Sequence, residues 1–114
     1  MTLWGSGTPR REFLHVDDLA DACVFLMRHY SADEHINVGF GSDVTIRELA
    51  ELVSRIVGFA GTFIYDAAKP DGTPRKLLDC SRLNALGWRA RRGLEQGIAE
   101  TYAWYRRNAA GLSH

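Results

Sequence analysis

Residues 45–58, Thr-Ile-Arg-Glu-Leu-Ala-Glu-Leu-Val-Ser-Arg-Ile-Val-Gly, contain the clearest local signal in the chain. Thr45 and Glu48 have the spacing of a capping box, in which each side chain satisfies a backbone N–H of the first helical turn. Gly58 stands where the C-terminal glycine of a helix belongs. The residues between follow helical spacing and give a wide apolar face: Ile46, Leu49, Ala50, Leu52, Val53, Ile56 and Val57.

The stretch before this helix predicts a strand, a helix and a second strand. Phe13–Val16 is apolar and predicts a short strand, and Asp17 or Asp18 is expected to cap a helix that runs to about Tyr30. His35–Val38 predicts another short strand. The buried stripe expected on the helix consists of Leu19, Ala22, Cys23, Leu26 and Tyr30.

The stretch after it continues the alternation of strand and helix. Thr62–Tyr65 predicts a strand, residues 69–76 a polar loop with turn chemistry, residues 81–86 a short helix, and residues 94–108 the last helix. Alternating strands and helices predict the α/β class, here as one unit over residues 1–114 with few short strands and about four helices. A sheet of so few strands is marginal by itself, which suggests a piece of something larger.

The composition of the chain argues against several classes of function. Fourteen Lys and Arg balance 14 Asp and Glu, so the formal net charge is zero. A nucleic-acid or anionic-membrane binder normally shows a basic excess, and we expect neither partner. The longest apolar run, Ala22–Met27, is far too short to span a bilayer. Two cysteines without metal-ligand spacing favour the cytoplasm over a disulfide framework, and no metal site is expected.

Two loops hold most of the side chains that could bind a ligand. They are Trp4, Arg10 and Arg11 in the first loop, and Lys69, Asp71, Arg75 and Lys76 in the second. Arginine suits a diphosphate because its planar fork donates two parallel hydrogen bonds, and lysine adds a point charge. A tryptophan can cover a base or sugar face, and an aspartate can accept from two neighbouring hydroxyls. These are the parts of a nucleotide-diphosphate-sugar site; the alternative is that the charges are solvated and bind nothing.

Three stretches resemble the GDP-L-fucose synthases, which are extended short-chain dehydrogenases/reductases, over nearly the whole chain and in the right order. They are residues 4–19, Trp-Gly-Ser-Gly-Thr-Pro-Arg-Arg-Glu-Phe-Leu-His-Val-Asp-Asp-Leu; residues 35–39 followed by 45–50; and residues 69–79, Lys-Pro-Asp-Gly-Thr-Pro-Arg-Lys-Leu-Leu-Asp, followed by Leu-Gly-Trp at 86–88. The 69–76 loop is quite specific to that family, whereas the Arg-Glu-Phe element is shared more widely among enzymes that act on nucleotide sugars.

The resemblance implies a C-terminal substrate-binding lobe. The family converts GDP-4-keto-6-deoxy-D-mannose to GDP-L-fucose with NADP(H), by epimerisation at C3 and C5 and reduction at C4. Carried over by matching motifs, Trp4, Arg11 and Asp71 would contact the GDP-sugar and Lys76 would hold a phosphate. Arg10 aligns with a variable position and receives no role. The resemblance leaves room for a homodimer of the full-length proteins.

The family's NADP-binding and catalytic motifs have no counterpart in this chain. The Gly-rich strand–turn–helix that opens the family is not matched, so no cofactor is expected to bind these residues. Tyr65 and Lys69 fit Tyr-x-x-x-Lys as a pattern, but Tyr65 ends a strand-like run and Pro70 disfavours helical geometry at Lys69. We therefore expect no catalytic residue and no reductase activity from the 114 residues alone.

Two alternatives stay open at this level. One keeps the class and changes the substrate, so that the chain is a lobe of another nucleotide-sugar epimerase or reductase. The other is a non-catalytic binding or interaction module.

Overall fold

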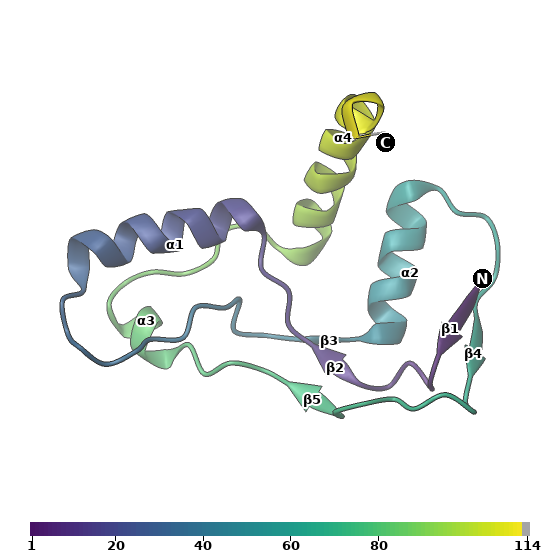
Figure 1. Ribbon diagram of the computed structural model, residues 1–114, viewed down its shortest axis with the longest axis horizontal. Helices are drawn as coiled ribbons and strands as arrows, with labels where there is room; N and C mark the ends of the chain where they lie inside the picture. The colour runs from purple at the N-terminus through teal and green to yellow at the C-terminus, as the bar shows by residue number, and fades with distance from the viewer. Residues whose placement is uncertain (113–114) are drawn as a thin grey trace.

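The computed structural model of the chain describes residues 1–112, which form an open α/β arrangement of four helices and short strands (Figure 1). The elements in chain order are β1 (Thr2–Trp4), β2 (Arg10–Arg11), α1 (Val16–His29), β3 (Val44–Thr45), α2 (Ile46–Val57), β4 (Ile64–Asp66), β5 (Arg75–Lys76), α3 (Ser81–Ala85) and α4 (Leu94–Leu112). The expected class and the few short strands are confirmed.

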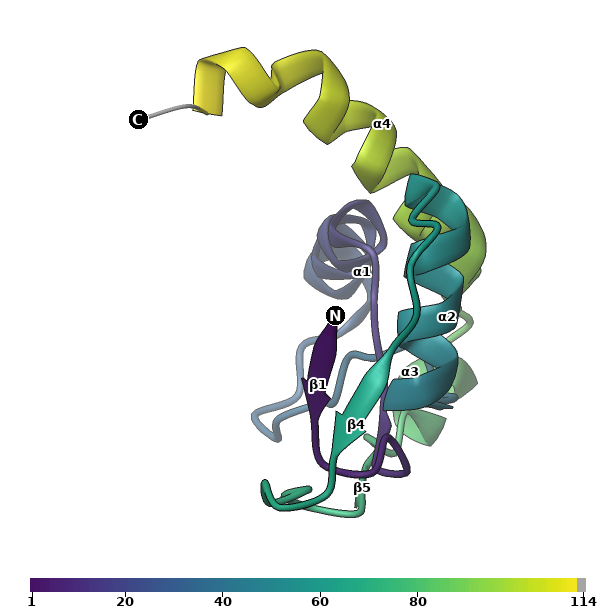
Figure 2. The same ribbon diagram turned by 90° about the vertical axis from the view of Figure 1, so that its right-hand side faces the viewer.

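The strands form two small sheets. β1 pairs with β4 in parallel, and β2 lies between β3, its antiparallel neighbour, and β5, its parallel neighbour. Figure 1 shows β2, β3 and β5 along the lower edge of the molecule, with α1 and α2 at opposite ends of it. Figure 2 shows β1 and β4 side by side in front of α2. Parts of the two expected loops thus lie in strands: Trp4, Arg10 and Arg11 of the first, and Arg75 and Lys76 of the 69–76 loop.

Two expected strands are not formed. Residues 13–15 and 35–38 have no regular secondary structure, although Leu14, Ile36 and Val38 pack against the core. The apolar residues in these segments are therefore explained by packing against the core and not by strand pairing. Within residues 1–112 no strand pairs with 35–38. Side chains hold this segment instead: Arg82 Nη1 donates to the His35 carbonyl at 3.0 Å, and Asn37 Nδ2 donates to the Asp79 carbonyl at 3.3 Å.

The helix expected from the capping box is confirmed. Thr45 is the N-cap of α2: its hydroxyl accepts from the Glu48 N–H at 3.0 Å, and Glu48 Oε1 accepts from the Thr45 N–H at 3.3 Å. Gly58 ends the helix with φ of 78°, a left-handed conformation that glycine adopts without strain. The apolar face of α2 lies against α4 and β3, and none of its residues is fully buried.

Replacement of Thr45 by alanine is expected to lower the free energy of unfolding by about 1 kcal/mol, because the first turn of α2 loses its side-chain cap. Urea denaturation followed by circular dichroism measures the change. Thr62→Ala, at an exposed position outside the helices, is the matched control. Equal midpoints for the two variants would show that the cap contributes nothing.

The N-cap of α1 is His15, and neither Asp17 nor Asp18 caps the helix as expected. The His15 Nδ1 accepts from the Asp17 N–H at 3.0 Å, so the ring takes the place that a carboxylate was expected to fill. Asp18 turns inward instead, with 1% of its surface exposed, and accepts from the backbone N–H of Arg92 at 3.0 Å and from its Nη1 at 3.1 Å. This pair ties the start of α1 to the segment before α4.

The buried stripe on α1 is narrower than expected. Ala22 is fully buried, but Leu19 is 43% exposed and Cys23 is also exposed, so the prediction of a core thiol at Cys23 is wrong. Cys80 is the buried cysteine. Burial raises the pKa of the Cys80 thiol.

A small core joins α1, α3 and the segment after α3. Ala22, Leu83 and Trp88 are its buried members, and the Trp88 indole donates to Asp21 Oδ2 at 2.9 Å. Partly buried apolar side chains surround it: Leu14, Phe25, Leu26, Ile36, Val38 and Ala90. No helix in the described part of the chain is long and apolar enough to cross a membrane.

Candidate functional site

Arg11 and Lys76, which are 65 positions apart in sequence, form one rung of the β2–β5 pair. Directly paired residues of neighbouring strands present their side chains on the same face of a sheet. Both side chains line a hollow of about 480 Å³ together with Glu12, Leu77 and Leu78. The structure thus brings together two of the residues expected to bind the nucleotide sugar.

Asp71 lies next to this pair through the glycine that follows it. A Cβ on Gly72 would lie 3.8 Å from Arg11 Nη2, so the 71–72 turn passes close to the Arg11 guanidinium. The Asp71 carboxylate accepts from the Ser6 N–H at 2.6 Å and from the Ser6 hydroxyl at 2.8 Å. These hydrogen bonds, the backbone one first, lower the pKa of Asp71. The carboxylate therefore stays charged and keeps lone pairs for a further donor.

Trp4 stands at the end of β1, immediately before the glycine whose backbone faces Asp71. Gly5 has φ of 83°, and a side chain there would collide with the Asp71 carboxylate. The Trp4 side chain is 70% exposed, and the Lys69 ammonium lies 5.2 Å from its ring centroid. An exposed indole beside a cation is a flat surface on which a base or sugar could stack.

Of the four residues expected to bind the ligand, two line this hollow, and neither Asp71 nor Trp4 does. Arg11 and Lys76 share a hollow, Asp71 adjoins Arg11, and Trp4 adjoins the turn that holds Asp71. Ser6 was missed by sequence reasoning. Its contact with Asp71 spans 65 positions, and no local pattern reveals it.

Arg10 and Arg75 form the neighbouring rung and point away from this hollow. Both bind Asp43, through Arg10 Nε at 3.0 Å and Arg75 Nε at 2.7 Å. The Asp43 side chain is 3% exposed. Burial would raise the pKa of Asp43, but the hydrogen bonds from Arg75 and Arg10 outweigh it and hold the pKa below its usual value. The structure therefore gives Arg10, which received no binding role, a structural one, and places Arg75 with it.

The Gly5-Ser6-Gly7 turn is closed and does not fit an NADP pyrophosphate. A Cβ on Gly7 would lie 2.6 Å from the Tyr65 ring, just as one on Gly5 would meet Asp71, so side chains of this chain already fill both approaches. The next element after the turn is the strand β2 rather than a helix. We assign none of these residues to the cofactor and derive no step through it.

Tyr65 and Lys69 do not form a catalytic pair on a helix. Tyr65 lies in β4 beneath the Arg47 guanidinium, which is 4.0 Å from its ring centroid, whereas Lys69 faces Trp4. Among the described residues no cluster of three His, Cys, Asp or Glu could hold a metal ion.

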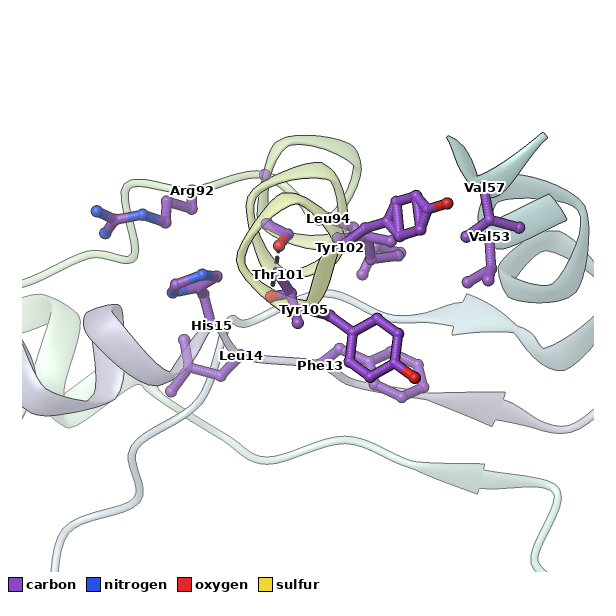
Figure 3. A pocket seen from close by; sticks show the side chains of 13 residues that line it. Phe13, Leu14, His15, Val53, Val57, Arg92, Leu94, Thr101, Tyr102 and Tyr105 are labelled. Carbon is purple, nitrogen blue, oxygen red and sulfur yellow. Dashed lines mark hydrogen bonds between the residues drawn. The ribbon is translucent and has the colours of Figure 1, made fainter. Parts of the chain in front are cut away.

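A second hollow, of about 390 Å³, lies between α2 and α4 and is largely apolar (Figure 3). Val53 and Val57 line it from α2, and Tyr102 and Tyr105 from α4. The dashed line in Figure 3 is the Thr101 hydroxyl donating to the Gly97 carbonyl at 2.8 Å, a bond within the helix. His15 and Arg92 stand at its edge, and both are engaged in the contacts at the start of α1. This lining suits packing between apolar surfaces rather than recognition of a charged ligand.

The carboxylates that accept hydrogen bonds within the fold make the free energy of unfolding decrease at low pH. The pKa is lowered in Asp43, Glu48, Asp71, Asp79 and Glu100. A carboxylate with a lowered folded-state pKa stabilises the fold fully above its unfolded value, here 3.8 for Asp and 4.5 for Glu. This stabilisation is lost as the pH falls through the folded value. Urea midpoints are therefore expected to be level down to about pH 5 and to decline below it; a rise in acid would contradict this.

Comparison with known proteins gives one consistent result. The family model "NAD dependent epimerase/dehydratase family" matches residues 1–39. A probable GDP-L-fucose synthase 1 from Oryza sativa subsp. japonica is 59% identical over 108 residues, which are 95% of this chain and 33% of that protein. The chain thus spans about a third of the length of the curated relatives it matches.

Solved structures share the fold. A GDP-L-fucose synthetase from Naegleria fowleri, bound to NADP, superposes with a TM-score of 0.90 at 27% identity, over 96% of this chain and 35% of that one. A GDP-6-OMe-4-keto-L-xylo-heptose reductase from C. jejuni has a TM-score of 0.86 at 39% identity, over 94% and 34%.

Proposed function

From the similarity of this chain to the GDP-L-fucose synthases over nearly all its length, we propose that it is the C-terminal, GDP-sugar-binding part of such an enzyme. The intact enzyme would epimerise C3 and C5 of GDP-4-keto-6-deoxy-D-mannose and reduce C4 with NADP(H). In this proposal the 114 residues supply contacts to the nucleotide and no catalytic residue.

The observation that supports the proposal most is the Arg11–Lys76 rung. Two cations stand side by side on one face, and within residues 1–112 neither forms an ion pair with a carboxylate. Like charges directly opposite each other destabilise a strand pair unless an anion lies between them. A diphosphate meets this need, because the guanidinium can grip it with parallel hydrogen bonds while the ammonium adds charge.

The remaining residues fit the rest of a nucleotide sugar. Asp71, kept charged by Ser6, would accept from hydroxyls of the ribose or the sugar. Trp4 would cover a flat face of the ligand. The surface is open, so we expect weak binding whose strength falls as salt screens the cations.

Titration with GDP, UDP and guanosine tests the proposal. GDP is expected to bind at least tenfold more tightly than guanosine, since the diphosphate supplies the charge-assisted hydrogen bonds. Guanosine binding equal to that of GDP would refute the diphosphate assignment. UDP binding equal to that of GDP would instead favour a lobe of another nucleotide-sugar enzyme, and absence of nucleotide binding would favour an interaction module.

We also propose that the protein works in the cytoplasm, where Cys23 and Cys80 stay reduced; neither forms a disulfide in the described residues. The balanced charge supports a small-molecule partner rather than nucleic acid or a membrane surface. A homodimer is proposed only for the full-length enzyme, whose size-exclusion profile with light scattering would test it.

A further inference from the structure

The β2–β5 pair is too short to hold itself together by its backbone alone. It contains two rungs, Arg10–Arg75 and Arg11–Lys76, and one flanking hydrogen bond from the Arg10 N–H to the Pro74 carbonyl at 2.8 Å. Both residues of β5 are exposed. Even as part of the three-stranded sheet β3-β2-β5, strands this short are marginal in water, so side chains are needed to fix β5 beside β2.

Asp43 is placed to do this. It lies just before β3, on the far side of β2 from β5, yet its carboxylate reaches an arginine from each of the two strands. Oδ1 accepts from Arg10 Nε at 3.0 Å, and Oδ2 accepts from Arg75 Nε at 2.7 Å. Arg75 Nη2 adds a longer contact to Oδ1 at 3.4 Å. One nearly buried carboxylate thus joins both strands.

The charges explain why this carboxylate matters for the neighbouring rung. Arg10 and Arg75 are like charges paired directly across the strands, an arrangement that repels unless it is neutralised. Asp43 places one negative charge between the two arginines on one face of the sheet, and Glu48 Oε1 lies 4.0 Å from Arg10 Nη1. Arg11 and Lys76, one residue further along, face the other way and keep their charge for a ligand. Glu12, which follows β2, continues this connection beyond the strands. Its carboxylate accepts from the N–H of Leu78, which follows β5, at 3.3 Å, and from the Gly41 N–H at 2.5 Å.

We propose that Asp43 is a positioning residue for the nucleotide-diphosphate site: by joining Arg10 to Arg75 it holds β5 against β2 and sets the Arg11–Lys76 pair at the spacing that a diphosphate needs. This inference rests on the proposed function, because it assigns the pair to a diphosphate. Asp43 itself touches no ligand in this account.

Asp43→Asn tests the inference in two independent measurements. The first, without ligand, is hydrogen exchange of the Arg10 amide, whose bond to Pro74 reports the β2–β5 pairing. We expect exchange to become about tenfold faster while amides of α1 keep their protection. The second is the dissociation constant for inorganic pyrophosphate, expected to rise about tenfold. Asp43→Glu, which keeps the charge, should restore part of both.

Controls separate this inference from the proposed function. Glu95→Gln, which breaks an exposed ion pair with Arg55, should change neither measurement. If Asp43→Asn fails to fold, Arg75→Gln removes one arm of the contact and makes the same prediction. The positioning role would be overturned if the Arg10 amide of Asp43→Asn exchanged at the original rate. It would also be overturned if that amide exchanged faster but pyrophosphate bound as tightly as before or more tightly. In both cases the proposed function would stand. Pyrophosphate binding that is absent, or insensitive to Arg11→Ala, would overturn both.

Discussion

Replacing Leu83 with alanine is expected to remove a large part of the stability of this chain. Leu83 is fully buried in α3, and the core that it shares with Ala22 and Trp88 contains few other buried apolar side chains. Truncating a buried leucine costs about 2–5 kcal/mol, because the lost transfer energy adds to the energy of the cavity left behind. Small domains have only about 5–15 kcal/mol to lose.

Urea denaturation followed by far-UV circular dichroism measures this effect. Leu86→Ala is the matched control, since Leu86 closes the same helix but is 41% exposed. The Leu83 variant should unfold at a much lower urea concentration or show no cooperative transition, whereas the Leu86 variant should shift the midpoint far less. Equal shifts would show that the core is not where we place it.

Replacing Arg11 with alanine is expected to weaken GDP binding about tenfold to a hundredfold. A hydrogen bond to a charged group contributes about 1.5–3 kcal/mol, and each 1.4 kcal/mol is about a tenfold change in affinity. Arg55→Ala, which removes an equally charged side chain from an exposed ion pair between α2 and α4, is the control and should leave the affinity unchanged. Arg10→Ala should have a smaller effect than Arg11→Ala, because Arg10 binds Asp43 and does not line the hollow.

The affinity difference between the Arg11 variant and the original chain should shrink as salt is added, since salt screens exposed charges. Equal affinities for the Arg11 and Arg55 variants at low salt would remove Arg11 from the site.

Local signals in the sequence predicted the helices well. The Thr45–Glu48 capping box and Gly58 mark both ends of α2 within its own residues, so no long-range contact is needed to find it. The strands were predicted poorly. β2 and β5 are two residues long and consist of charged side chains, so they show none of the alternation by which a half-buried strand is recognised. Their pairing depends on contacts far apart in sequence.

In the candidate site, too, sequence motifs identified some residues, whereas contacts between distant residues could not be predicted. Motif resemblance identified Arg11, Lys76, Asp71 and Trp4 as a set, and the structure brings the first two into one rung. It could not identify Asp43, because the two arginines that Asp43 joins are 33 and 32 positions away from it. The cap expected for α1 was wrong for a related reason: Asp18 bonds inward to Arg92, 74 positions later, and His15 caps the helix instead.

Mapping the GDP-binding surface by nuclear magnetic resonance tests the central claim most directly. With the chain labelled with nitrogen-15, GDP is expected to shift the Trp4 indole N–H and the amides of Ser6, Arg11, Gly72 and Lys76. These shifts should grow over a weak binding range and diminish with added salt. Shifts confined to the apolar hollow between α2 and α4, or tight binding insensitive to salt, would contradict the assignment of a GDP-sugar site to these residues.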